Sequence, residues 1–251
     1  MTDIAITGAC GKMGRVIAEL IKQRDDCRVC GGIDLQPADN LGFPVVRNIF
    51  DLPEKPHAVI DFSHPSALEN ILAYCKMKKV PAVIATTGYT DEQIKEIKAA
   101  AGQIPVFFTF NMSLGINLLA DLAKRAAQVL GTQFDVEIVE KHHNLKKDAP
   151  SGTALMLAES VNEVYRGEKK YIYDRHNVRK AREREEIGIS SVRGGTIVGE
   201  HEIIFAGHDE VITLSHSAQS KEVFAAGAVN AAVFIKDKGA GLYDMADLLS
   251  E

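Results

Sequence analysis

The chain has 251 residues, of which 46% are hydrophobic and 25% charged, and its formal net charge is −5. This balance is typical of globular proteins, and it argues against a nucleic-acid partner because phosphate binding requires clustered Lys and Arg on a basic domain. The apolar runs are much shorter than the ~20 residues that span a bilayer, and residues 1–6 lack the regions of a signal peptide. We therefore expect a cytoplasmic protein with no membrane or nucleic-acid partner.

The cysteines and histidines do not form a metal or disulfide pattern. Cys27 and Cys30 make a lone CxxC within a predicted strand, where residues three apart point to opposite faces. His201 and Glu202 begin a zincin-like motif, but the second His is absent. We expect no catalytic metal, and we interpret the scattered histidines 57, 64, 176, 208 and 216 mostly as surface or cap residues.

Short apolar runs alternate with helical patterns in the first half of the chain. The predicted strands are residues 3–7, 28–34, 58–62, 80–85 and 105–109, and the predicted helices are residues 12–23, 65–78 and 92–101. Strands that are apolar on both faces and separated by helices indicate a parallel sheet covered on both sides. The fold class expected here is α/β, a Rossmann-like doubly wound parallel sheet.

The second half has a different rhythm. A helical pattern over 116–130 is followed by predicted strands at 134–140, 187–192, 202–205 and 211–215, and an Ala-rich helix covers 223–235. Consecutive strands with little helix between them favour a second, α+β domain with a mostly antiparallel sheet. We expect a dinucleotide-binding domain over 1–114, completed by 221–251, and a second domain over 115–220.

A glycine-rich loop follows the first predicted strand. Gly8, Gly11 and Gly14 give GxxGxxG at the opening of the first helix, where glycine permits close approach to a pyrophosphate and the helix start supplies amides. The second strand ends in Asp34, where an acid accepts hydrogen bonds from ribose hydroxyls. That acid favours NADH over NADPH, no Arg directly follows it, and Lys12 partly offsets it. The loops 85–88 and 110–113 also follow strands and would border the nicotinamide.

The densest polar cluster reads EKHHNLKKDAPSGTA over residues 140–154. It closes a predicted strand and opens a helix at Pro150 and Ser151, and such a helix start binds carboxylates. Two imidazoles and the nearby ammonium groups add proton donors and positive charge for an anionic substrate. The segment therefore predicts a site for a small dianion.

These motifs resemble the 4-hydroxy-tetrahydrodipicolinate reductase (dihydrodipicolinate reductase) family of lysine and diaminopimelate biosynthesis. Besides the cluster at 140–154, the resemblance rests on GACGKMGR, DFSHP, ATTG, FNMSLGIN and RGGTIVGEH, which occur along the whole chain. It implies reduction of a cyclic dicarboxylate by NADH or NADPH. It also implies a homotetramer assembled through the second domain, which would bind substrate.

The resemblance also implies roles for individual residues. His142 would be the active-site histidine and Lys146 the proton donor, although the residues alone leave the donor open between them. The residues implied at the substrate are His143, Ser151, Gly152 and Thr153. The residues implied at the dinucleotide are Gly8, Ala9, Cys10, Gly11, Lys12 and Met13 at the pyrophosphate, Asp34 at the ribose, and Ala85, Thr86, Thr87, Phe110, Asn111, Met112 and Ser113 along the nicotinamide.

Two departures and two alternatives accompany this interpretation. Lys221 stands where the family often has Arg, and Ala85 where Gly is common, which bears on domain geometry more than on chemistry. A related amino-acid-pathway dehydrogenase is one alternative, but the acylating kind needs a nucleophilic Cys and the second domain has none. A dinucleotide-sensing protein without catalysis is the other.

Overall fold

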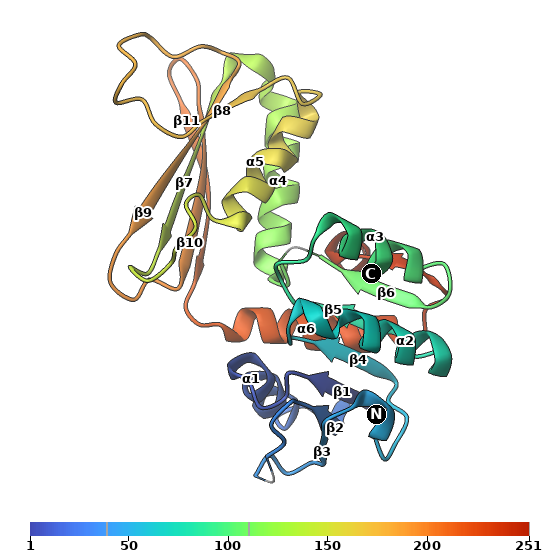
Figure 1. Ribbon diagram of the computed structural model, residues 1–251. Coiled ribbons are helices and arrows are strands. Elements are labelled where there is room, and N and C mark those ends of the chain that lie inside the picture. Colours follow the sequence, from blue (N-terminus) through green and yellow to red (C-terminus); the bar gives the residue numbers. More distant parts are fainter. Residues whose placement is uncertain (39, 110, 251) are drawn as a thin grey trace. The chain divides into compact units, whose positions relative to one another are not determined.

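The computed structural model describes residues 1–38, 40–109 and 111–250. It divides the chain into two compact units (Figure 1). Unit 1 comprises Met1–Leu114 and Lys221–Glu251, and unit 2 comprises Gly115–Ser220. The chain thus leaves unit 1, forms unit 2 and returns.

A parallel sheet forms the centre of unit 1. Within the described residues it has seven strands in the order β12-β6-β5-β4-β1-β2-β3, and every pairing is parallel. Its strands are β1 (Thr2–Thr7), β2 (Cys27–Ile33), β3 (Val45–Val46), β4 (Ala58–Asp61), β5 (Ala82–Ile84), β6 (Pro105–Phe108) and β12 (Gly241–Tyr243). The predicted doubly wound α/β fold is confirmed. The edge strands β3 and β12 were not predicted, because two or three residues carry too little periodicity.

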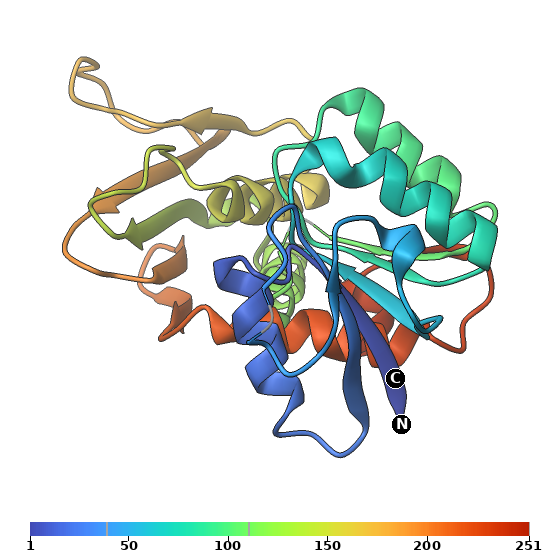
Figure 2. The same cartoon turned by 60° about the horizontal axis from the view of Figure 1, so that its bottom comes forward.

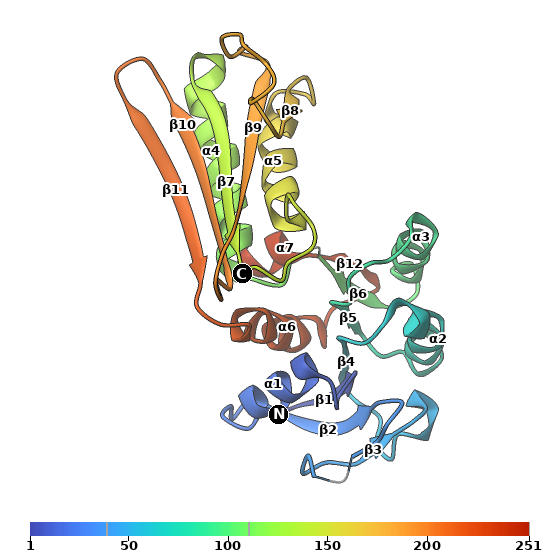
Figure 3. The same ribbon diagram turned by 60° about the vertical axis from the view of Figure 1, so that its left-hand side comes forward.

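Helices cover both faces of this sheet (Figure 3). Helices α1 (Lys12–Ile21) and α6 (Glu222–Ile235) lie on one face, and α2 (Leu68–Lys78) and α3 (Asp91–Ala100) lie on the other. Successive residues of β1 serve the two cores in turn, since Ile4 packs with the first pair of helices and Ala5 with the second. Shorter elements complete the unit: η1 (Ile49–Asp51), η2 (Pro65–Ala67) and α7 (Met245–Leu249).

The helix boundaries follow from local chemistry. Thr90 caps α3, because its hydroxyl accepts from the amide of Gln93 while the Gln93 side chain accepts from the amide of Thr90.

Helix α6 is rich in buried alanine, which allows its backbone to approach the sheet closely. At Gly227 a Cβ would lie 1.7 Å from the carbonyl oxygen of Met112, so only glycine fits. The buried alanines and Gly227 thus hold the returning helix α6 against the sheet of unit 1.

Unit 2 is a five-stranded sheet with helices on one face. Within the described residues the order is β11-β10-β7-β9-β8, and α4 and α5 share a buried core with these strands (Figure 2). The helices are α4 (Leu114–Leu130) and α5 (Gly152–Val164), with η3 (Gly131–Gln133) after α4. The strands are β7 (Asp135–His142), β8 (Lys170–Ile172), β9 (Glu186–Arg193), β10 (Gly199–Ala206) and β11 (Val211–Ala218).

The sheet of unit 2 is mixed, not mostly antiparallel as the sequence predicted. Strand β10 pairs antiparallel with β11 and β7, whereas β9 pairs parallel with β7 and β8. The prediction assumed that β9 and β10, which follow each other in the chain, are neighbours. The earlier strand β7 lies between them instead, and local periodicity does not encode such an insertion.

Candidate active site

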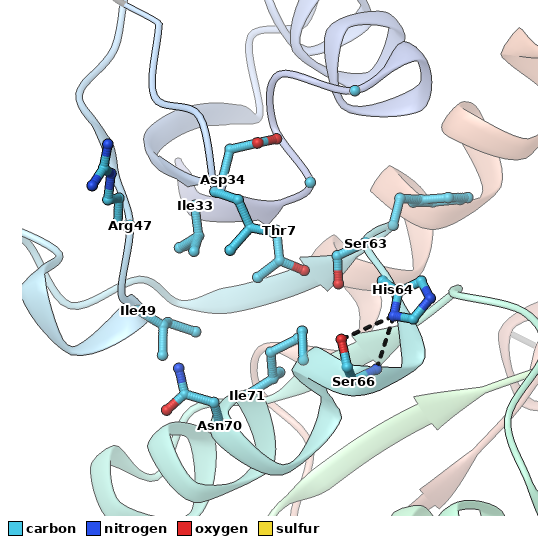
Figure 4. Close-up of a pocket in the computed structure, with 15 residues that line it drawn as sticks. Thr7, Ile33, Asp34, Arg47, Ile49, Ser63, His64, Ser66, Asn70 and Ile71 are labelled. Atoms are coloured by element: carbon cyan, nitrogen blue, oxygen red, sulfur yellow. Dashed lines mark hydrogen bonds between the residues drawn. The ribbon is translucent and has the colours of Figure 1, made fainter.

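A cavity of about 460 Å³ opens in unit 1 beyond the carboxyl ends of β1, β2 and β4 (Figure 4). This is the edge at which open α/β sheets bind their ligands. The lining residues are Thr7, Gly8, Gly11, Ile33, Asp34, Leu35, Arg47, Ile49, Phe62, Ser63, His64, Ser66, Ala67, Asn70 and Ile71. Gly8, Gly11 and Asp34 were predicted at the dinucleotide, and the remainder was not.

Glycine is required at two positions of the loop between β1 and α1. Gly8 has a φ of +74°, and a Cβ there would lie 2.3 Å from the carbonyl oxygen of Phe62. At Gly14 a Cβ would lie 2.2 Å from the carbonyl oxygen of Gly8. The loop therefore lies directly against the end of β4, and α1 lies directly against the loop.

The amides of this loop are divided between structure and ligand. Those of residues 8 to 11 already donate to backbone carbonyls or, for Cys10, to Asp34. Lys12 and Met13 form the first turn of α1, where amides have no partner within the helix. These two amides, with the positive end of the helix dipole, are the donors that a pyrophosphate could use.

Two backbone amides hold the Asp34 carboxylate in place. One oxygen, Oδ2, accepts from the amide of Cys10 at 2.9 Å, and the other, Oδ1, accepts from the amide of Gln36 at 3.1 Å. The carboxylate is therefore tied to the glycine loop at the edge of the cavity. Lone pairs remain on both oxygens for a ligand with hydroxyl groups.

Asp61 joins the loops around this cavity; the sequence pointed to it only as the first residue of the DFSHP motif, with no role assigned to it. Its carboxylate is completely buried and accepts from the hydroxyls of Thr7 and Ser63, both at 2.5 Å, and from Tyr89 at 2.8 Å. Burial, and then Asp61 itself, raises the pKa of the Tyr89 hydroxyl, so that this group remains a donor. The hydrogen bonds link the ends of β1 and β4 to the loop after β5.

The predicted residues after β5 differ in what they can offer a ligand. Ala85 belongs to the hydrophobic core, so only its backbone is available. Thr86 is buried, and its hydroxyl accepts from the amide of Ser63 at 2.8 Å. Thr87 is exposed. The loop is thus anchored to the end of β4 by Thr86.

The predicted residues after β6 are mostly buried. Phe110 lies outside the described residues. Asn111 and Ser113 are buried, and the Asn111 side chain accepts from the amide of Ser113 at 2.8 Å. Met112 packs in the core. This segment can therefore present backbone groups to a ligand.

A second group of predicted residues lies in unit 2, where β7 ends and α5 begins. Glu140 is the completely buried centre of this group. It accepts two hydrogen bonds from Arg193, at 2.6 and 2.8 Å, one from the amide of Ser151 at 3.1 Å, and one from His142. Burial favours a raised pKa for Glu140, but the hydrogen bonds from Arg193 and His142 outweigh it and hold the pKa at about 2.

His142 is oriented by this carboxylate. Its Nδ1 lies 2.6 Å from Glu140 Oε2, and a Cβ on Gly199 would lie 3.2 Å from its Nε2. Burial lowers the pKa of His142, and the hydrogen bond to Glu140 opposes this only in part. The imidazole is therefore neutral at pH 7, with its proton on Nδ1 facing the carboxylate.

His201 belongs to the same cluster, which the sequence interpretation missed. It is 4% exposed, its ring meets that of His142 edge to face with centroids 5.2 Å apart, and its Nε2 lies 3.1 Å from Ser151 Oγ. Burial lowers the pKa of His201 to about 4. The alternating pattern of β10 could have revealed it, because His201 shares the helix-facing side with Ile203 and Phe205.

Lys146 and His143 lie in the loop that follows β7. The ammonium of Lys146 lies 2.9 Å from Asp148 Oδ2, and the backbone amide of Lys146 donates to the carbonyl of His143 at 3.2 Å. The Nδ1 of His143 is buried without a hydrogen-bond partner among the described residues. The loop thus carries one cation held near the surface and one imidazole with an unused nitrogen.

Ser151 caps helix α5. It is 2% exposed, and its hydroxyl accepts from the amide of Ala154 at 3.1 Å. Because this hydroxyl also contacts His201, it holds the helix start in place. Gly152 is exposed, and a Cβ on it would meet nothing, so the start of α5 is open beside Thr153.

The described residues contain no group of three or more His, Cys, Asp or Glu that could hold a metal ion. Cys27 and Cys30 are free, they pack into the two opposite cores of unit 1, and burial raises both pKa values to about 11. No helix among the described residues is long and apolar enough to cross a membrane.

Comparisons with known proteins match the whole chain. Residues 2–112 match the family model of the dihydrodipicolinate reductase N-terminus, and residues 115–249 match that of the C-terminus. The C-terminal model thus includes α6 and α7, which the structure places in unit 1.

Curated relatives are similar over the same length. The 4-hydroxy-tetrahydrodipicolinate reductase of Caldanaerobacter subterraneus subsp. tengcongensis is 49% identical over 100% of this chain and 99% of its own. The protein of that name from Clostridium tetani is 44% identical over 100% and 98%.

Solved structures agree in fold. A dipicolinate-bound dihydrodipicolinate reductase from Paenisporosarcina sp. TG-14 has a TM-score of 0.80 and 28% identity, covering 97% of each chain. A putative myo-inositol dehydrogenase from Sinorhizobium meliloti 1021 has a TM-score of 0.65 at 13% identity, covering 100% of this chain and 94% of its own, and shows likeness of fold alone. By its two family models and its full-length relatives, the chain belongs to the dihydrodipicolinate reductase family.

Proposed function

We propose that this chain reduces 4-hydroxy-tetrahydrodipicolinate to tetrahydrodipicolinate with NADH or NADPH, in lysine and diaminopimelate biosynthesis. The proposal is supported by full-length similarity to proteins of that name and by the family models. The observation that carries it is the buried Glu140, which holds His142, Arg193 and the start of α5 in one cluster. Such a cluster presents polar groups of fixed orientation to a small anion.

We assign the dinucleotide to the cavity of unit 1. We assign the pyrophosphate to the amides of Lys12 and Met13 and the adenosine ribose to Asp34. When bound, a reduced nicotinamide supplies the hydride. Asp34 favours NADH, because its charge opposes a 2′-phosphate. The loops after β5 and β6 would border the nicotinamide, mainly through backbone groups.

The substrate carboxylates are assigned to the start of α5 and the loop before it. Gly152 and Thr153 open the helix, where amides and the helix dipole favour a carboxylate. The unused Nδ1 of His143 adds a further hydrogen-bonding group. Ser151 supports this arrangement as the helix cap, because its hydroxyl is buried and engaged.

We assign the proton donor to Lys146. His142 is a poorer donor because burial lowers its pKa and its Nδ1 proton faces Glu140. The Lys146 ammonium has three protons and contacts only one carboxylate, that of Asp148, among the described residues. His142 then holds the substrate through Nε2, while Lys146 delivers the proton that complements the hydride.

Two further properties follow from family membership and stay predictions. The first is a homotetramer assembled through the open face of the unit 2 sheet. The second is a cytoplasmic location. Sedimentation of the purified chain tests the first directly, since a monomer would contradict it.

A calorimetric titration separates this reductase from a dinucleotide sensor or another dehydrogenase. The chain is titrated with NADH and then with pyridine-2,6-dicarboxylate, a planar analogue of the substrate. A reductase binds both, and binding of the dicarboxylate is lost in His143→Ala. A chain that binds NADH but is indifferent to the dicarboxylate would contradict the proposal.

A further inference from the structure

The dinucleotide cavity carries a cation that the sequence did not reveal. The charged side chains that line it are Asp34 and Arg47. No Arg directly follows Asp34 in the sequence, which argued for NADH. The fold supplies one from thirteen positions further along the chain.

Strand pairing explains how Arg47 reaches this position. Strands β2 and β3 are parallel neighbours in which Ile33 pairs with Val46. The amide of Asp34 donates to the carbonyl of Val46 at 3.0 Å. Asp34 and Arg47 each follow one member of that pair, so they leave adjacent strands that lie about 5 Å apart. Figure 4 shows both side chains at the same end of the cavity.

Arg47 differs from Asp34 in what already binds it. Each oxygen of the Asp34 carboxylate already accepts one hydrogen bond from a backbone amide. The side chain of Arg47 is exposed, and among the described residues no hydrogen bond or ion pair engages it. A guanidinium presents a planar set of donors that matches a phosphate in a bidentate manner. The guanidinium, for which the described residues supply no partner, lines the same cavity as the carboxylate assigned to the ribose and is therefore placed for a phosphate on that ribose.

We propose that Arg47 binds the adenosine 2′-phosphate and thereby admits NADPH alongside NADH. This inference rests on the proposed function, in which Asp34 receives the ribose. Asp34 alone would repel the phosphate, and Arg47 offsets that charge within the same cavity. The pair of residues sets the ratio between the two cofactors, whereas Asp34 by itself would set only a preference for NADH.

A different role for Arg47 makes a different prediction. A guanidinium that stacks on the adenine ring would strengthen the binding of NADH and NADPH equally, because both cofactors carry the same ring. A contact with the 2′-phosphate strengthens the binding of NADPH alone. The ratio of kcat/KM for the two cofactors therefore separates the two roles, and it does not depend on the fraction of enzyme that is folded.

The test compares Arg47→Gln with Arg47→Lys in the full-length chain. We expect Arg47→Gln to lower kcat/KM for NADPH about 10- to 100-fold and to leave that for NADH within about twofold, since a charge-assisted hydrogen bond is lost. Arg47→Lys should recover part of the loss. Lys98→Gln removes the same charge from α3, outside the cavity lining, and should leave the ratio unchanged.

Binding of nucleotide fragments gives a readout that needs no turnover. In calorimetry, Arg47→Gln should lower the affinity for adenosine 2′,5′-bisphosphate about 10-fold or more and leave the affinity for AMP unchanged. An unchanged cofactor ratio, or equal losses for both cofactors or both fragments, would overturn the assignment. If neither cofactor is oxidised by any variant, the proposed reductase function fails, and the fragment titrations still decide the role of Arg47.

Discussion

Glu140 and His142 are joined by a 2.6 Å contact between Oε2 and Nδ1 at the end of β7, where the carboxylate is completely buried. Arg193 binds the same carboxylate through two nitrogens, and the amide of Ser151 also donates to it. One carboxylate therefore fixes the imidazole, the end of β9 and the start of α5. These hydrogen bonds offset the free-energy cost of burying the carboxylate.

Replacing this carboxylate tests its role as a positioning group. Glu140→Gln keeps the shape but leaves the Arg193 charge uncompensated, so we expect a loss of about 2–4 kcal/mol in the free energy of unfolding. We also expect kcat to fall while the KM for NADH stays the same, because the change lies at the proposed substrate group. Urea unfolding and steady-state kinetics measure both.

Glu200→Gln is the matched control for this substitution. Glu200 forms a partly exposed ion pair with Lys141 at 3.2 Å, which contributes about 1 kcal/mol or less. If Glu140→Gln behaved like Glu200→Gln in both assays, Glu140 would have no positioning role.

The proton donor is tested by replacing the two candidates separately. Lys146→Ala should lower kcat by about 10²- to 10⁴-fold, the usual contribution of a general acid. His142→Asn should lower kcat less than Lys146→Ala does. It should raise the KM for 4-hydroxy-tetrahydrodipicolinate, since the neutral imidazole is assigned to holding the substrate and not to donating the proton. Lys170→Ala, an exposed residue of β8, should retain wild-type kinetics. Wild-type turnover in Lys146→Ala would refute the assignment of the proton donor to Lys146.

The buried His201 makes stability depend on pH. In the unfolded chain it takes up a proton below the ordinary histidine pKa of about 6.5, whereas in the folded chain burial lowers that pKa to about 4. The folded state therefore loses stability as pH falls from 6.5 to 4, by roughly 2–4 kcal/mol from this group. His142 and His216 add in the same direction, because burial also lowers their pKa values.

His201→Gln isolates this contribution. Urea unfolding of the variant at about pH 7 and at about pH 4.5, on either side of the range in which the unfolded histidine titrates, should show a smaller drop in the free energy of unfolding than the wild type shows. An identical drop would mean that His201 titrates normally in the folded chain.

The Asp61 network predicts a separate effect on the cofactor. The Asp61 carboxylate accepts hydrogen bonds from three hydroxyls. Asp61→Asn replaces one of its two accepting oxygens by an NH2 donor. We therefore expect weaker NADH binding and a loss of about 1–3 kcal/mol in the free energy of unfolding. Tyr89→Phe removes one hydrogen bond and leaves Thr7 and Ser63 in place, so its effect on NADH should be smaller. Calorimetric titration with NADH ranks the two variants. Equal affinity in Asp61→Asn and wild type would contradict a positioning role.

Sequence patterns predicted where helices and strands lie in the chain better than they predicted which strands pair with one another. Apolar runs located the long strands of unit 1, and Gly8 to Gly14 marked the turn into α1, because these signals are local. The insertion of β7 between β9 and β10 and the pairing of β2 with β3 are not local, and they bring Glu140 to Arg193 and Asp34 to Arg47. Such pairs depend on register between strands distant in sequence.

Burial explains the other differences. His201 resembled a failed metal motif in the sequence, because its significance arises only when β10 turns it toward His142. Ala85 and Met112 stay predicted at the nicotinamide, but only through their backbones, because the fold places their side chains in the core. A side chain that faces the core is distinguished from one that faces a ligand by tertiary packing, which a linear pattern does not contain.

The most direct test follows the absorbance of NADH and of NADPH in the presence of freshly generated 4-hydroxy-tetrahydrodipicolinate. We predict that wild type oxidises both cofactors, one molecule per molecule of tetrahydrodipicolinate formed, and that Lys146→Ala nearly abolishes the reaction while still binding NADH. The absence of oxidation of either cofactor by a folded wild-type chain that binds NADH would contradict the account.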